Sequence, residues 1–185
     1  MKTNENIALY VLRLAGTLFL IAAVVAALLA GVNAVTAPVI AELNAAATQE
    51  AISAVLPGGF DSEITDYADA SGIVSKVYQG ANGYALEVGP GGFDNTITMM
   101  VGIDNEGKVL GISIVNHTET AGLGAVADAD TPKGIAFREQ FVGTSGSVAV
   151  SKDGGTLDAI TGATITSRAI CVGVNAALDC VAGLG

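Results

Sequence analysis

Residues 158–167 read Asp158-Ala159-Ile160-Thr161-Gly162-Ala163-Thr164-Ile165-Thr166-Ser167. This stretch begins with turn-forming residues and leads into an apolar segment, residues 170–184, with helical spacing. The first backbone N–H groups of a helix are unpaired and the helix dipole is positive there, so hydroxyl and small residues at a helix start suit a bound anion. Taken alone, the stretch equally suits an ordinary N-cap, with Thr161 or Thr164 accepting a hydrogen bond from the backbone.

The N-terminal part of the chain is strongly apolar. No charged residue occurs from Leu14 to Ala41, and an apolar run of roughly 20 residues is enough to cross a bilayer as one helix. Lys2 and Arg13 precede the run, which by the positive-inside rule predicts a cytoplasmic N-terminus and an extracytoplasmic remainder. Residues 32–34 resemble a signal-peptide cleavage site. The run is longer than a typical signal core, however, which favours a retained anchor in the cell membrane.

The segment after the predicted span consists of a predicted helix followed by an acidic loop. Thr36-Ala37-Pro38 is expected to end the span, and residues 39–56 then carry apolar side chains at steps of three and four, which predicts an amphipathic helix. Pro57-Gly58-Gly59 should stop this helix. Residues 61–69 are acidic, which is typical of a solvated loop.

From Ile73 onward the apolar spacing changes to two, which is typical of strands. Two hairpins are predicted, one pairing residues 73–78 with 84–88 and the other pairing 96–103 with 109–115. A short helix at 136–141 and a short strand at 147–151 should precede the C-terminal helix. The prediction is therefore an α+β fold, with a single transmembrane helix followed by a mostly antiparallel sheet packed with helices.

The expected domain organisation follows from these elements. Residues 1–13 form a cytoplasmic N-terminus and residues 14–36 a transmembrane helix. Residues 37–72 form a connecting amphipathic helix with an acidic loop, and residues 73–185 form an extracytoplasmic domain.

Charge and the reactive side chains exclude several functions. The net charge is −10 with only 8 Lys and Arg residues, so nucleic acid is not an expected partner. His117 is the only histidine, which leaves neither a catalytic triad nor a metal site to predict. Cys171 and Cys180 would lie about 13 Å apart on one helix, too far for a disulfide, and are expected in the core.

A second distinctive stretch follows a predicted strand and reads Asn116-His117-Thr118-Glu119-Thr120-Ala121-Gly122-Leu123-Gly124. A strand that runs into a polar, then glycine-rich loop places backbone N–H groups and short side chains where a flat ligand can approach. By itself the loop could equally be a turn with an incidental carboxylate.

Together the two stretches resemble the signatures of FMN-binding domains. Residues 161–164, with Asp158 upstream, resemble the flavinylation motif, and residues 117–124 resemble the Glu-Thr-Pro-Gly-Leu-Gly signature, with Ala121 in place of the usual proline. Val101-Gly102-Ile103-Asp104 followed by Gly107-Lys108 is similar to the family's hairpin. The resemblance extends from about Ile73 to the C-terminus. Within the family, the chain is most similar to G subunits of Rnf electron-transport complexes, and next to C subunits of sodium-pumping NADH:quinone reductases.

The resemblance implies a covalent cofactor. FMN would be joined by a phosphoester to the hydroxyl of Thr164, and a flavin transferase would attach it. Asp158, Thr161, Gly162, Ala163 and Thr166 would surround the phosphate, and the isoalloxazine ring would lie near Glu119, Thr120, Gly122, Leu123 and Gly124. Neither catalytic residues of the chain's own nor metal ligands are implied. We also hypothesise that Glu119 disfavours the anionic reduced flavin, which the midpoint potential of a Glu119→Gln variant would test.

The function that the resemblance implies is electron transfer. The chain would be the flavinylated electron-carrier subunit of a membrane complex that couples electron flow from ferredoxin to NAD⁺ to the movement of Na⁺ or H⁺. It would be part of a translocating oxidoreductase without a substrate site of its own, and its partners would be the other subunits. Three alternatives stay open: a quinone-reductase C subunit, a stand-alone tethered FMN protein, and, as the weakest, a tethered binding module without flavin in which Thr164 is only a cap.

Overall fold

The computed structural model describes residues 2–184, with side chains from Leu9 onward. The chain divides into two compact units, Met1–Ala46 and Ala47–Gly185. The second unit therefore begins within the segment that the sequence-based division treated as a connection, and it includes the last turns of the first helix.

A single long helix, α1 (Lys2–Val55), contains the whole apolar N-terminal run. Its segment from Leu9 to Val55 is long and apolar enough to cross a membrane, and large apolar side chains such as Phe19 and Leu29 are exposed along it. The hydroxyls of Thr17 and Thr36 donate to the carbonyls of Leu14 (2.8 Å) and Val32 (3.0 Å) within the helix. These polar groups are thus satisfied without water, as a lipid environment requires.

The predicted break at Thr36-Ala37-Pro38 is wrong, because Pro38 lies inside α1. A proline removes one backbone hydrogen bond and crowds the preceding turn, yet transmembrane helices tolerate it when neighbouring groups compensate. The helix formers on either side of Pro38, mainly Ala and Leu, continue the helix to Val55.

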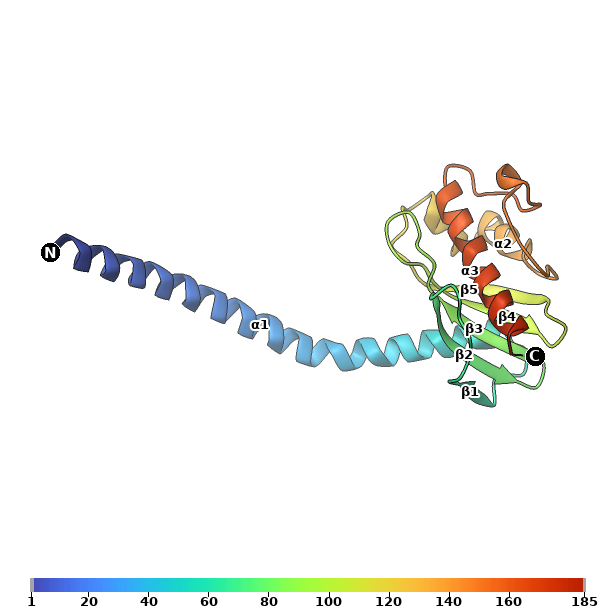
Figure 1. Cartoon of the computed structure of the whole chain (residues 1–185), viewed down its shortest axis with the longest axis horizontal. Coiled ribbons are helices and arrows are strands. Elements are labelled where there is room, and N and C mark those ends of the chain that lie inside the picture. Colours follow the sequence, from blue (N-terminus) through green and yellow to red (C-terminus); the bar gives the residue numbers. More distant parts are fainter. Residues whose placement is uncertain (1, 185) are drawn as a thin grey trace. The chain divides into compact units, whose positions relative to one another are not determined.

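The second unit is built on a five-stranded antiparallel sheet in the order β1-β2-β3-β4-β5 (Figure 1). Its strands are β1 (Ser62–Ile64), β2 (Val74–Gly80), β3 (Gly83–Val88), β4 (Thr98–Asp104) and β5 (Val109–Asn116). Both predicted hairpins are confirmed. The first closes at Gly80 opposite Gly83, where the backbone of Gly83 has a φ of 145° that favours glycine.

Two short segments differ from prediction. β1 falls within the acidic stretch that was expected to be a loop, and it pairs along the edge of β2. The predicted strand at 147–151 is wrong. Val150 makes only an isolated parallel bridge with Leu157, and the chain then turns into the 3-10 helix η2 (Ser151–Asp153).

Three further helical segments complete the unit: η1 (Gly124–Ala127), α2 (Pro132–Glu139) and α3 (Thr164–Ala182). α2 begins earlier than the predicted 136–141, because Thr131 caps it by accepting from the N–H of Gly134 (3.3 Å) and Pro132 suits its first turn. α3 is also long and apolar enough to span a membrane, but most of it is buried inside the domain. It is a core helix.

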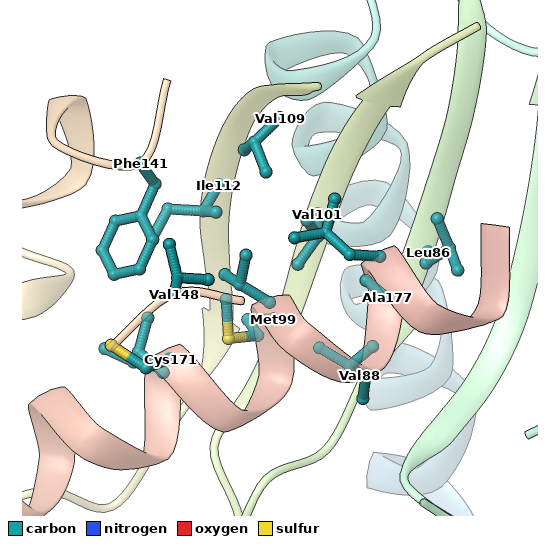
Figure 2. Close-up of a cluster of buried hydrophobic side chains, with 14 of the residues drawn as sticks. Leu86, Val88, Met99, Val101, Val109, Ile112, Phe141, Val148, Cys171 and Ala177 are labelled. Atoms are coloured by element: carbon teal, nitrogen blue, oxygen red, sulfur yellow. The ribbon is translucent and has the colours of Figure 1, made fainter. Parts of the chain in front are cut away.

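The main hydrophobic core lies between α3 and one face of the sheet (Figure 2). Cys171 and Ala177 of α3 face Val88, Met99 and other side chains of β3, β4 and β5 there. Both cysteines are buried and free, as predicted from the sequence.

A smaller cluster forms where the end of α1 packs on the sheet. Ile52, Val55 and Leu56 are almost fully buried in it with Tyr78 and Met100. Val55 approaches the sheet so closely that a Cβ at Gly102 would overlap its backbone. The last turns of α1 are therefore part of the folded domain.

Candidate functional site

The start of α3 carries no side-chain cap. Ala163 occupies the N-cap position, and neither Thr161 nor Thr164 accepts a capping hydrogen bond there. The alternative in which these threonines serve simply as caps is therefore wrong. The uncapped first turn, which begins at Thr164, retains the positive end of the helix dipole and can attract an anion.

A cavity of about 320 Å³ lies at this helix start. It brings together the two distinctive stretches of the sequence, which come from α3 and from the loop after β5. Its lining residues are Phe93, Glu119, Thr120, Leu123, Gly124, Lys152, Gly162, Ala163, Thr164, Ile165 and Thr166. We call it the Thr164 cavity. Eight of the eleven predicted cofactor-binding residues line it, and Asp158, Thr161 and Gly122 do not.

Lys152 is the cation of the Thr164 cavity. Its ammonium Nζ lies 3.4 Å from Oγ1 of Thr164 and donates to that hydroxyl. Lys152 was not predicted as a site residue, although only six of the chain's Lys and Arg residues follow Ala41 and this one lies twelve positions before Thr164. A lysine next to an uncapped helix start adds a full positive charge to the partial charge of the dipole.

An ion pair ties the segment that carries Lys152 to α3. Arg168, one turn after Thr164, donates from Nε and Nη2 to the two carboxylate oxygens of Asp153, each at 2.6 Å. These hydrogen bonds hold the pKa of Asp153 below its usual range, and the carboxylate in turn raises the pKa of Arg168. Both side chains are therefore charged at neutral pH, and their two-pronged contact ties η2 to α3.

Glu119 organises the interior of the site. Its side chain is only 8% exposed, and its Oε1 accepts from the N–H groups of Phe93 (2.8 Å) and Asp94 (3.3 Å). Its Oε2 accepts from the hydroxyl of Thr166. The carboxylate thus joins the loop after β3, the loop after β5 and α3. A Cβ on Gly124 would overlap this carboxylate, which explains the glycine there.

Thr166 also lines the Thr164 cavity, and its buried hydroxyl donates to Glu119. Its predicted contact with the flavin phosphate stays a prediction. Thr164, by contrast, is partly exposed at the cavity wall.

Apolar side chains form the rim of the Thr164 cavity. Phe93 is 65% exposed, Ile165 50% and Leu123 43%. Phe93 and Ile165 were missed from the sequence. Phe93 could have been found from the sequence as an aromatic residue directly after Gly91-Gly92, in the loop before β4. Exposed apolar surface around a polar floor suits a flat aromatic ring with one charged end.

The three remaining predicted residues line a second cavity, of about 580 Å³. Asp158, Thr161 and Gly122 lie there with Lys133 of α2 and with Gln140, which directly follows α2. The backbone turns between the two cavities at Gly162, where φ is 80°. This left-handed conformation favours glycine, and a Cβ at Gly162 would also come within 2.9 Å of the Leu123 side chain.

Other reactive groups in the described residues do not form a site. No group of three or more His, Cys, Asp and Glu side chains between residues 2 and 184 could hold a metal ion. Burial raises the pKa of the Cys171 thiol to about 11, so this thiol is neutral at physiological pH.

The Thr164 cavity fits FMN on its own chemistry. Lys152 and the uncapped helix start suit the phosphate, and the apolar rim suits the isoalloxazine ring. Residues 92–179 match the family described as the FMN-binding domain. Fold and site thus define an FMN-binding protein.

The N-terminal region and the full-length relatives specify the family further. Residues 2–55 match the family described as the RnfG N-terminal region. The G subunit of the Na⁺-translocating ferredoxin:NAD⁺ oxidoreductase complex of Acetobacterium woodii is 34% identical, covering 97% of this chain and 97% of the relative. The G subunits of ion-translocating oxidoreductase complexes from Methanosarcina acetivorans (33% identical; 89% of this chain, 91% of the relative) and Pseudomonas aeruginosa (34%; 90% and 86%) are also similar. The chain belongs to the Rnf family of G subunits.

Proposed function

We propose that this chain is the membrane-anchored electron-carrier subunit of an Rnf-type ion-translocating oxidoreductase, and that its FMN is attached covalently to Thr164. The observation that carries the attachment is the position of the Thr164 hydroxyl, on an uncapped helix start and 3.4 Å from the Lys152 ammonium. Family membership and the matched FMN-binding domain support the electron-carrier role.

Five residues of the Thr164 cavity have a definite part in this proposal. The Thr164 oxygen would attack the FMN phosphorus of a flavin dinucleotide that a flavin transferase brings. The pyrophosphate bond of the dinucleotide would break, its nucleoside monophosphate half would leave, and the hydroxyl proton would be released. Lys152 and the first N–H groups of α3 offset the negative charge of the resulting phosphodiester. Phe93, Leu123 and Ile165 flank the ring system. Bound FMN supplies one- and two-electron redox chemistry, while the protein sets its position and access.

Ion movement is assigned to the other subunits of the complex. The chain has no charged residue from Leu14 to Ala41, so its apolar run offers no ionisable group for an ion or proton pathway. Its contribution is electron relay from ferredoxin toward NAD⁺, and the coupling ion, Na⁺ or H⁺, is set elsewhere in the complex.

Electron relay has a direct test in membranes. Membranes that carry the complete complex with Thr164→Val in this chain should lose ferredoxin:NAD⁺ electron transfer to background, because the relay lacks its cofactor. The matched change Thr156→Val, at an exposed threonine outside the cavity, should leave the rate at the wild-type value. A wild-type rate in Thr164→Val membranes that contain no FMN on this chain would refute the relay.

The orientation in the membrane is a separate prediction. With Lys2 and Arg13 before the apolar run, the N-terminus should be cytoplasmic and residues 47–185 extracytoplasmic. Protease added outside spheroplasts should then digest the FMN-binding domain, while a cytoplasmic marker protein in the same sample remains intact. Full protection of the domain until the membrane is opened by detergent would reverse the orientation.

A further inference from the structure

The side chain of Gln140 makes two hydrogen bonds to the backbone of the segment that leads to Thr164. This residue follows α2 directly as its C-cap. Its Oε1 accepts from the N–H of Asp158 at 2.7 Å, and its Nε2 donates to the carbonyl oxygen of Asp158 at 3.2 Å. One carboxamide thus satisfies both backbone polar groups of a single residue, in the manner of a neighbouring strand.

The chain on either side of Asp158 is anchored in other ways. Before it, the N–H of Leu157 donates to Ala149 (3.2 Å), and the carbonyl of Leu157 accepts from Ser151 (2.7 Å). After it, the fully buried hydroxyl of Ser167 accepts from the N–H of Ile160 (3.0 Å) and donates to the carbonyl of Ala163 (2.9 Å). Gln140 supplies the anchor between these two.

This segment forms walls of both cavities. Residues 158–161 line the second cavity, and residues 162–166 line the Thr164 cavity. The position of residues 158–163 therefore controls how the wall next to the Thr164 hydroxyl is placed. A shift of this wall would move Gly162 relative to the Leu123 side chain, which lies so near that a Cβ at Gly162 would come within 2.9 Å of it.

We propose that Gln140 is a positioning residue for attachment of the cofactor: its two hydrogen bonds to Asp158 hold residues 158–163 so that the Thr164 hydroxyl is presented to the incoming flavin phosphate. The proposal rests on the proposed covalent attachment to Thr164. Gln140 does not touch the reacting atoms. It acts through the backbone, as α2 packs on the domain core by way of Phe137.

The effect should appear in the rate of attachment. Transfer to an oxygen is sensitive to orientation, and a misplacement of about 1 Å can cost roughly 100-fold in rate, so we expect Gln140→Met to slow attachment about tenfold or more. Gln140→Glu keeps the acceptor for the Asp158 N–H and loses the donor to its carbonyl, so its rate should be intermediate. With either variant as the protein substrate, the kcat of the flavin transferase should fall by a larger factor than its KM for that substrate rises.

The full chain is incubated with a flavin transferase and its flavin nucleotide substrate, and the fluorescence of covalently bound flavin is measured over time. Thermal unfolding of each variant shows whether it is folded. Asn82→Leu is the matched control. Asn82 also anchors a backbone carbonyl, that of Pro57 (2.8 Å), but from the β2–β3 hairpin, which contributes no residue to either cavity. It should be flavinylated at the wild-type rate.

The possible outcomes separate this inference from the proposed function. If the wild type takes up no covalent flavin, the attachment itself is refuted. If the wild type is modified and folded Gln140→Met is modified equally fast, the role of Gln140 is refuted. Slowing of Asn82→Leu to the same degree would also refute it, since general destabilisation would then be the cause. Should Gln140→Met fail to fold, a wild-type rate in Gln140→Glu would refute the role of Gln140 instead.

Discussion

Thr164→Val is expected to leave the protein band dark under ultraviolet light after denaturing electrophoresis, whereas the wild type fluoresces. Valine has nearly the same shape as threonine but lacks the hydroxyl oxygen through which the phosphoester forms. Thr164 is partly exposed and its hydroxyl makes one contact, at 3.4 Å to Lys152, so the substitution should cost little stability. The measurement is in-gel fluorescence after co-expression with a flavin transferase.

Two further variants make this result specific. Thr164→Ser restores a hydroxyl and should recover fluorescence, although the missing methyl group leaves its orientation less restricted. Thr156→Val removes an exposed threonine hydroxyl elsewhere in the same segment and should fluoresce as the wild type does. A fluorescent Thr164→Val band would show that another residue carries the flavin.

Removal of the last turns of α1 should have the largest effect on stability. A chain that begins at Pro57 loses Ile52, Val55 and Leu56, which are 1%, 2% and 0% exposed. Burial of one such side chain is worth about 1.5–3 kcal/mol, so the loss is roughly 5 kcal/mol or more, comparable with the whole stability of a typical domain. We expect residues 57–185 not to fold cooperatively, as measured by urea unfolding followed by circular dichroism.

The matched control is a chain that begins at Ala47. It keeps these three residues and omits the apolar run from Leu14 to Ala41, so it should be soluble and unfold in one cooperative transition. Equal unfolding midpoints for the two chains would mean that the end of α1 does not stabilise the domain.

Much of the fold could be predicted because its signals are local. The alternation of apolar and polar residues in 73–88 and 96–115 predicted both hairpins, and the charge-free run after Arg13 predicted a transmembrane helix over residues 14–36, which lies within α1. The continuation of that helix through Pro38 and the edge strand Ser62–Ile64 could not be predicted in this way. From the sequence, Pro38 indicates a helix end, but the helix formers on either side of it continue the helix. The edge strand depends on its pairing with β2, a tertiary contact that overrides local propensity.

The site was predictable only in part, for a related reason. Residues 119–124 and 161–166 were found because each forms a short local pattern. Lys152 and Gln140 act through contacts across 12 and 18 positions of the chain, with Thr164 and Asp158 respectively, and no spacing rule connects them. The division of the motif between two cavities depends on the turn at Gly162, whose φ of 80° places its neighbours on separate walls.

The central claim is that Thr164 carries FMN, and mass spectrometry of the protein purified from its native membranes tests it most directly. Cleavage after Lys152 and Arg168 releases the peptide of residues 153–168. We predict that this peptide is heavier by the mass of FMN less one water, and that fragmentation places the added mass on Thr164. An unmodified peptide, or the same added mass on Thr161 or Thr166, would contradict the claim.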